Sequence, residues 1–179
     1  MTFYSDIRAA KPSAPLRTIA VLAGLLILLA GCATPAPKPS LAQRQTQTLT
    51  QLGFHPVDDG WMLALPANIS FDVDKTDIKP EAHATLRDFA RQLLDVDIRQ
   101  LRTEGHTDNV GPRDYNLTLS QRRAAAVADV FLASGFTAKN VQSKGFGFDH
   151  PQADNATEAG RAQNRRVEII VPSDALATP

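Results

Sequence analysis

Cysteine is rare in this chain of 179 residues, and neither sign of charge is in excess. The single Cys excludes an intramolecular disulfide and a zinc site built from several thiolates. The 19 Lys and Arg residues balance the 19 Asp and Glu residues, so the basic excess that holds a nucleic-acid backbone is missing. We therefore expect no nucleic-acid partner. The apolar share of 43% is nevertheless large enough for the core of one globular domain.

Long apolar runs are also missing. The longest run, residues 19–30, has twelve residues, whereas a transmembrane helix needs about 20. Arg8, Lys11 and Arg17 precede this run, and a basic segment followed by a short apolar run is typical of an export signal. We therefore predict that this part of the chain directs export and is not a permanent membrane span.

The one cysteine follows the apolar run directly. Leu29-Ala30-Gly31-Cys32 resembles the lipobox of bacterial lipoproteins, which implies cleavage after Gly31 and a lipid on Cys32. Residue 33 is Ala, whereas Asp at this position retains enterobacterial lipoproteins in the inner membrane. The resemblance therefore implies anchoring in the outer membrane, with the domain facing the periplasm. The alternative is a secretory signal peptide with a chance Cys near its cleavage site.

Composition divides the chain into four parts. Pro recurs at every second position from 35 to 39 and predicts a stiff spacer. Residues 41–52 are weakly amphipathic and predict a helix that Gly53 ends. We predict a lipoprotein signal peptide at 1–31, the lipidated Cys with a tether at 32–57, a folded domain at 58–172 and a C-terminal tail at 173–179.

The predicted domain alternates strands and helices. A turn signal at residues 58–60 lies between two short strand-like runs, so a hairpin opens the domain. Apolar periodicity predicts two helices, the second with Ser120 as its N-cap. The expected elements are strands at 54–57, 61–65, 98–105, 141–147 and 166–171, and helices at 80–94 and 120–134. This order predicts an α/β fold, an α+β two-layer sandwich.

Two motifs are the most specific feature of the sequence. They are Glu104-Gly105-His106-Thr107-Asp108 and Asn116-x-x-Leu119-Ser120-x-x-Arg123-Ala124-x-x-Val127. Together they resemble the OmpA-like peptidoglycan-binding domain, and the likeness continues at residues 143–147 and 164–168. The resemblance covers about residues 61–172. It implies a mixed sheet of the βαβαβ type with its helices packed on one face.

The motifs place one acid and one base near a common cleft. Asp108 ends a predicted strand, and Arg123 lies on the first turn of the helix predicted from Ser120. A ligand with an ammonium and a carboxylate on one carbon would satisfy both side chains. The free end of meso-diaminopimelate in a Gram-negative stem peptide is such a centre, and the N-terminus of the helix would favour its anionic part. The alternative is an internal salt bridge between Asp108 and Arg123.

The family resemblance also assigns supporting residues. It carries diaminopimelate binding, by position, to Asp108, Arg123, Asn116, Thr107, Val73 and Asp74. In the Arg165-Arg166 pair that opens the last predicted strand, alternation directs one side chain to each face of the sheet. We expect Arg165 to reach the ligand or to hold its acidic neighbours; the alternative is a solvated strand edge.

The sequence predicts neither a metal site nor an enzyme. The four His residues fall on different elements without metal-binding spacing, and the Asp-rich segment 72–77 lacks the Gly and Glu of a calcium loop. No nucleophile motif is present, and no cofactor is expected. The competing hypothesis is a cell-wall hydrolase that uses Asp108 with His106.

Within the family, the chain most resembles the small regulatory lipoproteins of the YfiB type. The residues that carry this likeness are 52–54, 59–61, 95–98 and 153–161. The resemblance implies a link from outer membrane to cell wall and a signalling partner, a periplasmic repressor of an inner-membrane diguanylate cyclase. The alternative is a purely structural lipoprotein of the Pal type. A homodimer is left open.

The tether gives the regulatory hypothesis a physical basis. Fully extended, the 28 residues after Cys32 would reach roughly 90 Å, and a helix at residues 41–52 would shorten that reach. We hypothesise that docking of Leu49, Leu52 and Phe54 on the domain competes with partner binding. The alternative is that these side chains only complete the core.

Overall fold

The computed structural model describes residues 38–71 and 75–178. A compact unit begins at Pro39 and takes in the rest of the chain. The predicted signal peptide, Cys32, Val73 and Asp74 lie outside the described residues. Among the residues that are described, none forms a helix long and apolar enough to cross a membrane.

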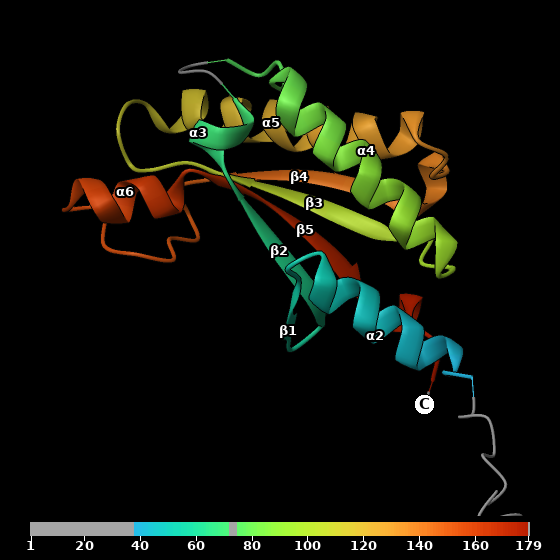
Figure 1. The fold of residues 1–179 in the computed structure, drawn as a ribbon. Helices are drawn as coiled ribbons and strands as arrows, with labels where there is room; N and C mark the ends of the chain where they lie inside the picture. The colour runs from blue at the N-terminus through green and yellow to red at the C-terminus, as the bar shows by residue number, and fades with distance from the viewer. Residues whose placement is uncertain (1–37, 72–74, 179) are drawn as a thin grey trace, which may run out of the picture. The chain divides into compact units, whose positions relative to one another are not determined.

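A five-stranded mixed sheet forms the centre of the unit (Figure 1). Its order is β1-β2-β5-β3-β4; β3 and β4 are parallel, and the other neighbours are antiparallel. The strands are β1 His55–Val57, β2 Gly60–Pro66, β3 Leu101–His106, β4 Val141–Gly147 and β5 Arg166–Pro172. The hairpin predicted at the start of the domain is therefore present.

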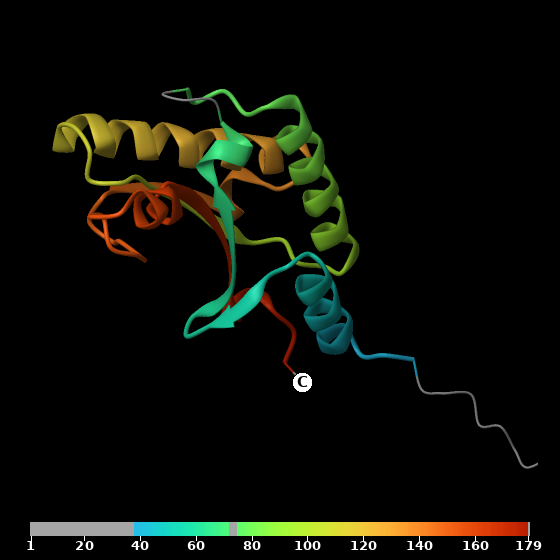
Figure 2. The ribbon, with the colours of Figure 1, turned by 60° about the vertical axis from the view of Figure 1, so that its left-hand side comes forward.

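Two long helices, α4 Pro80–Asp95 and α5 Arg113–Ala133, cover one face of the sheet (Figures 1 and 2). Glycine makes the close approach of α5 possible. A Cβ on Gly105 would lie 2.0 Å from the carbonyl oxygen of Ser120, and one on Gly145 would lie 2.3 Å from the amide nitrogen of Gln121. This arrangement confirms the predicted α+β two-layer fold.

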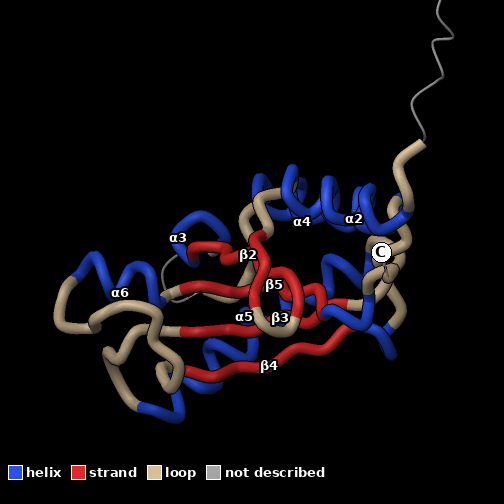
Figure 3. Tube along the Cα trace, turned by 90° about the horizontal axis from the view of Figure 1, so that it is seen from below, coloured by secondary structure: helices blue, strands red, loops and turns tan. Residues whose placement is uncertain are grey.

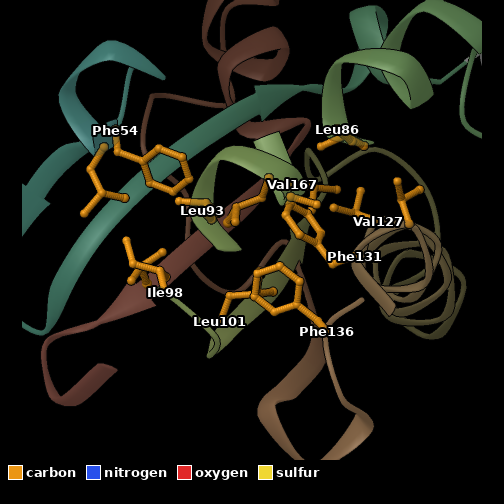
Figure 4. Close-up of a cluster of buried hydrophobic side chains, with 14 of the residues drawn as sticks. Phe54, Leu86, Leu93, Ile98, Leu101, Val127, Phe131, Phe136 and Val167 are labelled. Carbon is orange, nitrogen blue, oxygen red and sulfur yellow. The ribbon is translucent and has the colours of Figure 1, made fainter. Parts of the chain in front are cut away.

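The hydrophobic core lies between these helices and the sheet. Figure 4 shows that side chains from both layers meet there, together with Phe54, which precedes β1. Phe131 and Phe136 cross at 90° with their ring centroids 5.5 Å apart. The labelled members are Phe54, Leu86, Leu93, Ile98, Leu101, Val127, Phe131, Phe136 and Val167.

The helix α2, Leu41–Gln51, belongs to the compact unit although we expected its residues to be part of a tether. Ser40 caps it, and Gly53 follows its end with a φ of 87°. Leu49 and Phe54 are buried in the core, and Leu52 packs against it. The predicted helix is confirmed, and its apolar side chains dock on the domain.

The α5 helix corrects one prediction. It begins at Arg113 after Pro112, and not at Ser120. Ser120 is buried inside the helix, where its hydroxyl donates to the carbonyl of Leu117 and accepts from the amide of Gly147. The residue fixes α5 to β4, and the N-terminus of α5 lies ten residues before Arg123.

Further short elements were not predicted. They are α3 Ala67–Ser70, α6 Glu158–Asn164 and the 3-10 turns η1 Ala138–Asn140 and η2 Ser173–Ala175. The α6 helix is capped by Thr157, whose side chain accepts from the amide of Gly160. Figure 3 shows α3 and α6 at one end of the sheet, away from α2.

Candidate functional site

A pocket of about 440 Å³ lies at the end of the sheet that α3 and α6 occupy. It is bounded by α3, by the turn after β3, by one side of α5 and by α6 with the start of β5. Its lining residues are Ala67, Asn68, Phe71, Thr107, Asp108, Val110, Tyr115, Asn116, Leu119, Arg123, Glu158, Arg161 and Arg165. Five of the predicted site residues, Thr107, Asp108, Asn116, Arg123 and Arg165, are therefore brought together.

Asp108 is the second residue after the end of β3 and is buried. Its Oδ1 atom accepts from the amide of Val110 at 3.0 Å, and its Oδ2 atom pairs with Nη1 of Arg165 at 2.6 Å. The ion pair of Asp108 is thus made with Arg165 and not with Arg123, which corrects the alternative of an Asp108–Arg123 salt bridge.

Arg123 also lines the pocket. It is 5% exposed, its Nε atom donates to the carbonyl of Lys75 at 3.1 Å, and its guanidinium lies 5.1 Å from the centre of the Phe71 ring. Because α5 begins at Arg113, Arg123 lies in the third turn of the helix and not in its first. This cation–π contact with Phe71 helps to hold the guanidinium at the pocket wall.

Thr107 and Asn116 have different roles. Asn116 is buried, and its amide donates to the carbonyls of Val110 and Pro112, so it braces the loop after Asp108. Thr107 is also buried, but within the described residues its hydroxyl has no hydrogen-bond partner. A buried hydroxyl in a pocket wall is available to a ligand.

Arg165 lies between two carboxylates. Its Nη1 atom contacts Asp108, and its Nη2 atom contacts Glu158 at 2.7 Å. The hydrogen bond to Asp108, followed by that to Glu158, raises the pKa of Arg165. Arg166 instead pairs with Glu168 at 2.7 Å. Of the two adjacent arginines, Arg165 is the one that lines the pocket.

Glu158 and Arg161 of α6 are pocket residues that the sequence analysis missed. Hydrogen bonds from Arg165 and then from Arg161 lower the pKa of Glu158. The sequence did contain a signal for them. Glu158 and Arg161 are three residues apart and follow Thr157, a residue type that can cap a helix, so they could have been predicted to pair on one helical face. The rim also holds Val110 and Tyr115, whose exposed fractions of 63% and 49% leave apolar surface beside the charged groups.

A second polar cluster, Glu104, His106 and Glu168, lies away from the pocket. One ligand atom from each lies within 4.8 Å of the others, as in a metal site. However, Glu104 and Glu168 each pair with an arginine at 2.7 Å, so their charges are already balanced. His106 is 3% exposed, stacks on Phe146 and is not among the described residues that line the pocket with Asp108.

Comparison with known proteins identifies the family. The family model for "OmpA family" matches residues 70–165, a segment that contains both motifs and most of the pocket. The chain belongs to the OmpA family. It is 44% identical over 161 residues to the "Outer-membrane lipoprotein YfiB" of Pseudomonas aeruginosa, covering 89% of this chain and 96% of that protein. As an OmpA-family member with such relatives, it is an outer-membrane lipoprotein.

Solved structures support the same assignment. The cell wall anchor of the T6SS from Pseudomonas aeruginosa superposes with a TM-score of 0.60 at 29% identity, covering 76% of this chain and 99% of that one. The peptidoglycan-associated lipoprotein from Burkholderia pseudomallei does so with a TM-score of 0.51 at 31% identity, covering 57% and 86%. The OmpA-like fold predicted from the motifs is confirmed.

Proposed function

We propose that this outer-membrane lipoprotein binds peptidoglycan non-covalently through the diaminopimelate of its stem peptides. One observation carries the proposal: Asp108 and Arg123, both largely buried, line one pocket and present opposite charges to it. A ligand centre with an ammonium and a carboxylate matches that pair of charges. The names of two similar structures, a cell wall anchor and a peptidoglycan-associated lipoprotein, support this ligand.

The pocket offers a distinct contact for each part of the ligand. The guanidinium of Arg123 donates to the carboxylate, because its planar fork matches two oxygens and its contact with the Phe71 ring limits its motion. Asp108 pairs with the ammonium, and the hydroxyl of Thr107 hydrogen-bonds the same centre. Val110 and Tyr115 at the rim contact the methylene groups of the ligand. No covalent step is required.

Co-sedimentation with purified sacculi tests the proposal. We expect the mature wild-type chain to pellet with the sacculi, and Asp108→Asn and Arg123→Ala each to weaken binding by about tenfold or more, because each loses a charge-assisted hydrogen bond. Thermal melts establish that the variants are folded.

Arg87→Ala is the matched control, since Arg87 is an exposed arginine of α4 outside the pocket. Wild-type protein that stays in solution would contradict the proposal, as would folded pocket variants that pellet like the control.

We further propose that the protein relays the state of the envelope to a periplasmic repressor of a diguanylate cyclase. The likeness to YfiB over 96% of that relative's length supports a shared role. The docking of α2 supports a mechanism, because Leu49 and Phe54 are buried and only undocking would expose them to a partner. Release of α2 would also lengthen the reach of the chain between membrane and wall.

A further inference from the structure

Both carboxylate oxygens of Asp108 are already engaged. Oδ1 accepts from the amide of Val110, and Oδ2 contacts Arg165 at 2.6 Å. An ammonium that pairs with Asp108 must therefore share this carboxylate with a guanidinium, which repels it. The pocket needs a second acceptor for Arg165 if it is to bind a zwitterion.

Glu158 is that second acceptor. Its Oε1 atom already contacts Nη2 of Arg165 at 2.7 Å, while its Oε2 atom contacts Arg161 at 2.8 Å. The side chain of Glu158 is 66% exposed and that of Arg165 is 34% exposed, whereas that of Asp108 is only 12% exposed. The side chains of Arg165 and Glu158 can therefore rearrange while the buried carboxylate of Asp108 stays in place.

The charge count of the pocket depends on Glu158. Among the described residues that line the pocket, Glu158 is the carboxylate that pairs with both Arg161 and Arg165. Without Glu158, these two arginines lose a shared negative partner, and the whole charge of Arg165 is directed at Asp108. Both changes favour the binding of an anion over that of a zwitterion, because positive charge close to the ligand repels its ammonium.

We infer that Glu158 is a positioning residue that makes this pocket selective for a free ammonium. When the ligand's ammonium binds to Asp108, Glu158 attracts Arg165 away from Asp108. The negative charge of Glu158 also balances the positive charge that the ammonium brings into the pocket. This inference rests on the proposed function, because it concerns the same pocket and the same ligand. Glu158 acts through Arg165 and is not assigned a ligand contact of its own.

Two tripeptides test the inference. The first is L-Ala-γ-D-Glu-meso-diaminopimelate with its free amine, and the second carries an acetyl group on that amine. Calorimetric titration of the full mature chain gives the ratio of the two affinities. We expect the wild type to prefer the free amine, Glu158→Gln to reduce that preference about tenfold, and Glu158→Asp to restore part of it.

Glu81→Gln is the matched control. It removes the same charge from an exposed position in the first turn of α4, outside the pocket, and we expect it to keep the wild-type preference. Thermal melts establish that all the variants are folded.

The outcomes separate the two proposals. If the wild type binds neither tripeptide nor sacculi, the proposed function itself is wrong. If the wild type prefers the free amine and Glu158→Gln prefers it equally, only the role of Glu158 is overturned. If Glu158→Gln weakens both tripeptides by the same factor, the residue merely supports the pocket, and the inference also fails.

Discussion

Glu168 shows how much a single buried carboxylate depends on its neighbours. It is 7% exposed, and its Oε1 atom accepts from Arg166 and Gln152. Its Oε2 atom lies 3.6 Å from Nε2 of His106. Burial alone would raise the pKa of Glu168, but the interactions with His106 and Arg166 outweigh burial and lower that pKa from 4.5 to about 2.

This shift predicts an acid-dependent loss of stability. Because the pKa of Glu168 is lower in the folded chain, its contribution is fully present above pH 4.5 and is lost as the pH falls to about 2. We expect the free energy of unfolding to fall less steeply over this interval in Glu168→Gln than in the wild type. Urea unfolding at several pH values measures both slopes, and parallel curves would contradict the assignment.

The sequence revealed only part of the pocket. The motifs were enough to single out Asp108 at the end of a predicted strand, Arg123 on a predicted helix and Arg165 at the start of the last strand, because the family resemblance assigns binding roles by position along the chain. The role of Arg165 as the partner of Asp108 was not visible, since it depends on β5 lying beside β3. Glu158 was missed because α6 is a short helix whose position relative to β3 is set by tertiary contacts.

At the scale of elements, the backbone of α5 packs so closely on β3 and β4 that two positions of these strands have no space for a side chain. Gly145 on β4 faces the backbone of Gln121, and Gly105 on β3 faces that of Ser120. The hydroxyl of Ser120 also accepts from the amide of Gly147. Since α5 carries Asn116 and Arg123, this packing determines where the pocket residues lie.

Gly145→Ala should therefore disturb both folding and binding. The added Cβ would meet backbone at 2.3 Å, so α5 must shift away from β4. We expect a loss of about 3 kcal/mol in the free energy of unfolding and weaker binding to sacculi in the protein that remains folded. Ser143→Ala, at an exposed position of the same strand, is the control. Equal stability of the two variants in urea unfolding would show that the packing tolerates the shift.

Element types were predictable where one physical signal dominated. The spans of α4, β4 and β5 agree with those predicted to within one residue; a Pro at N1 marks the start of α4, and apolar residues make up most of β5. The start of α5 was wrong by seven residues. Ser120 has the side chain of an N-cap, and only the packing of β4 against it shows that it lies inside a helix.

At the scale of the whole unit, one buried side chain joins segments far apart in the sequence. Gln45 of α2 is 2% exposed; its Nε2 atom donates to the carbonyl of Val96, and its Oε1 atom accepts from the amide of Ala177. The segment 173–178 thus closes over the same region that α2 covers. Docking of α2 and placement of the C-terminal segment therefore depend on each other.

Gln45→Ala tests the proposed relay through α2. The change leaves two backbone groups without partners and should weaken docking by about 2 kcal/mol. We expect faster hydrogen exchange of the α2 amides in the purified chain. In cells that hold the repressor and the cyclase, we expect a higher level of cyclic di-GMP, since more of the released segment is available to the repressor.

Gln51→Ala is the control, because Gln51 is the exposed last residue of α2. If α2 exchanges faster in Gln45→Ala but cyclic di-GMP stays at the level of the control, the release of α2 is not the signal.

The placement of α2 and α6 at opposite ends of the sheet has a mechanical consequence (Figures 1 and 3), because residues of α6 line the pocket. A lipid anchor would pull on the chain at the α2 end, and a bound stem peptide would hold it at the α6 end. Tension between membrane and wall would then run roughly along β2, β5 and β3. Because the hydrogen bonds between strands lie across this direction, they would be loaded together in shear and not opened one at a time. The docked α2 is not part of that ladder, so we expect it to detach before the strands separate.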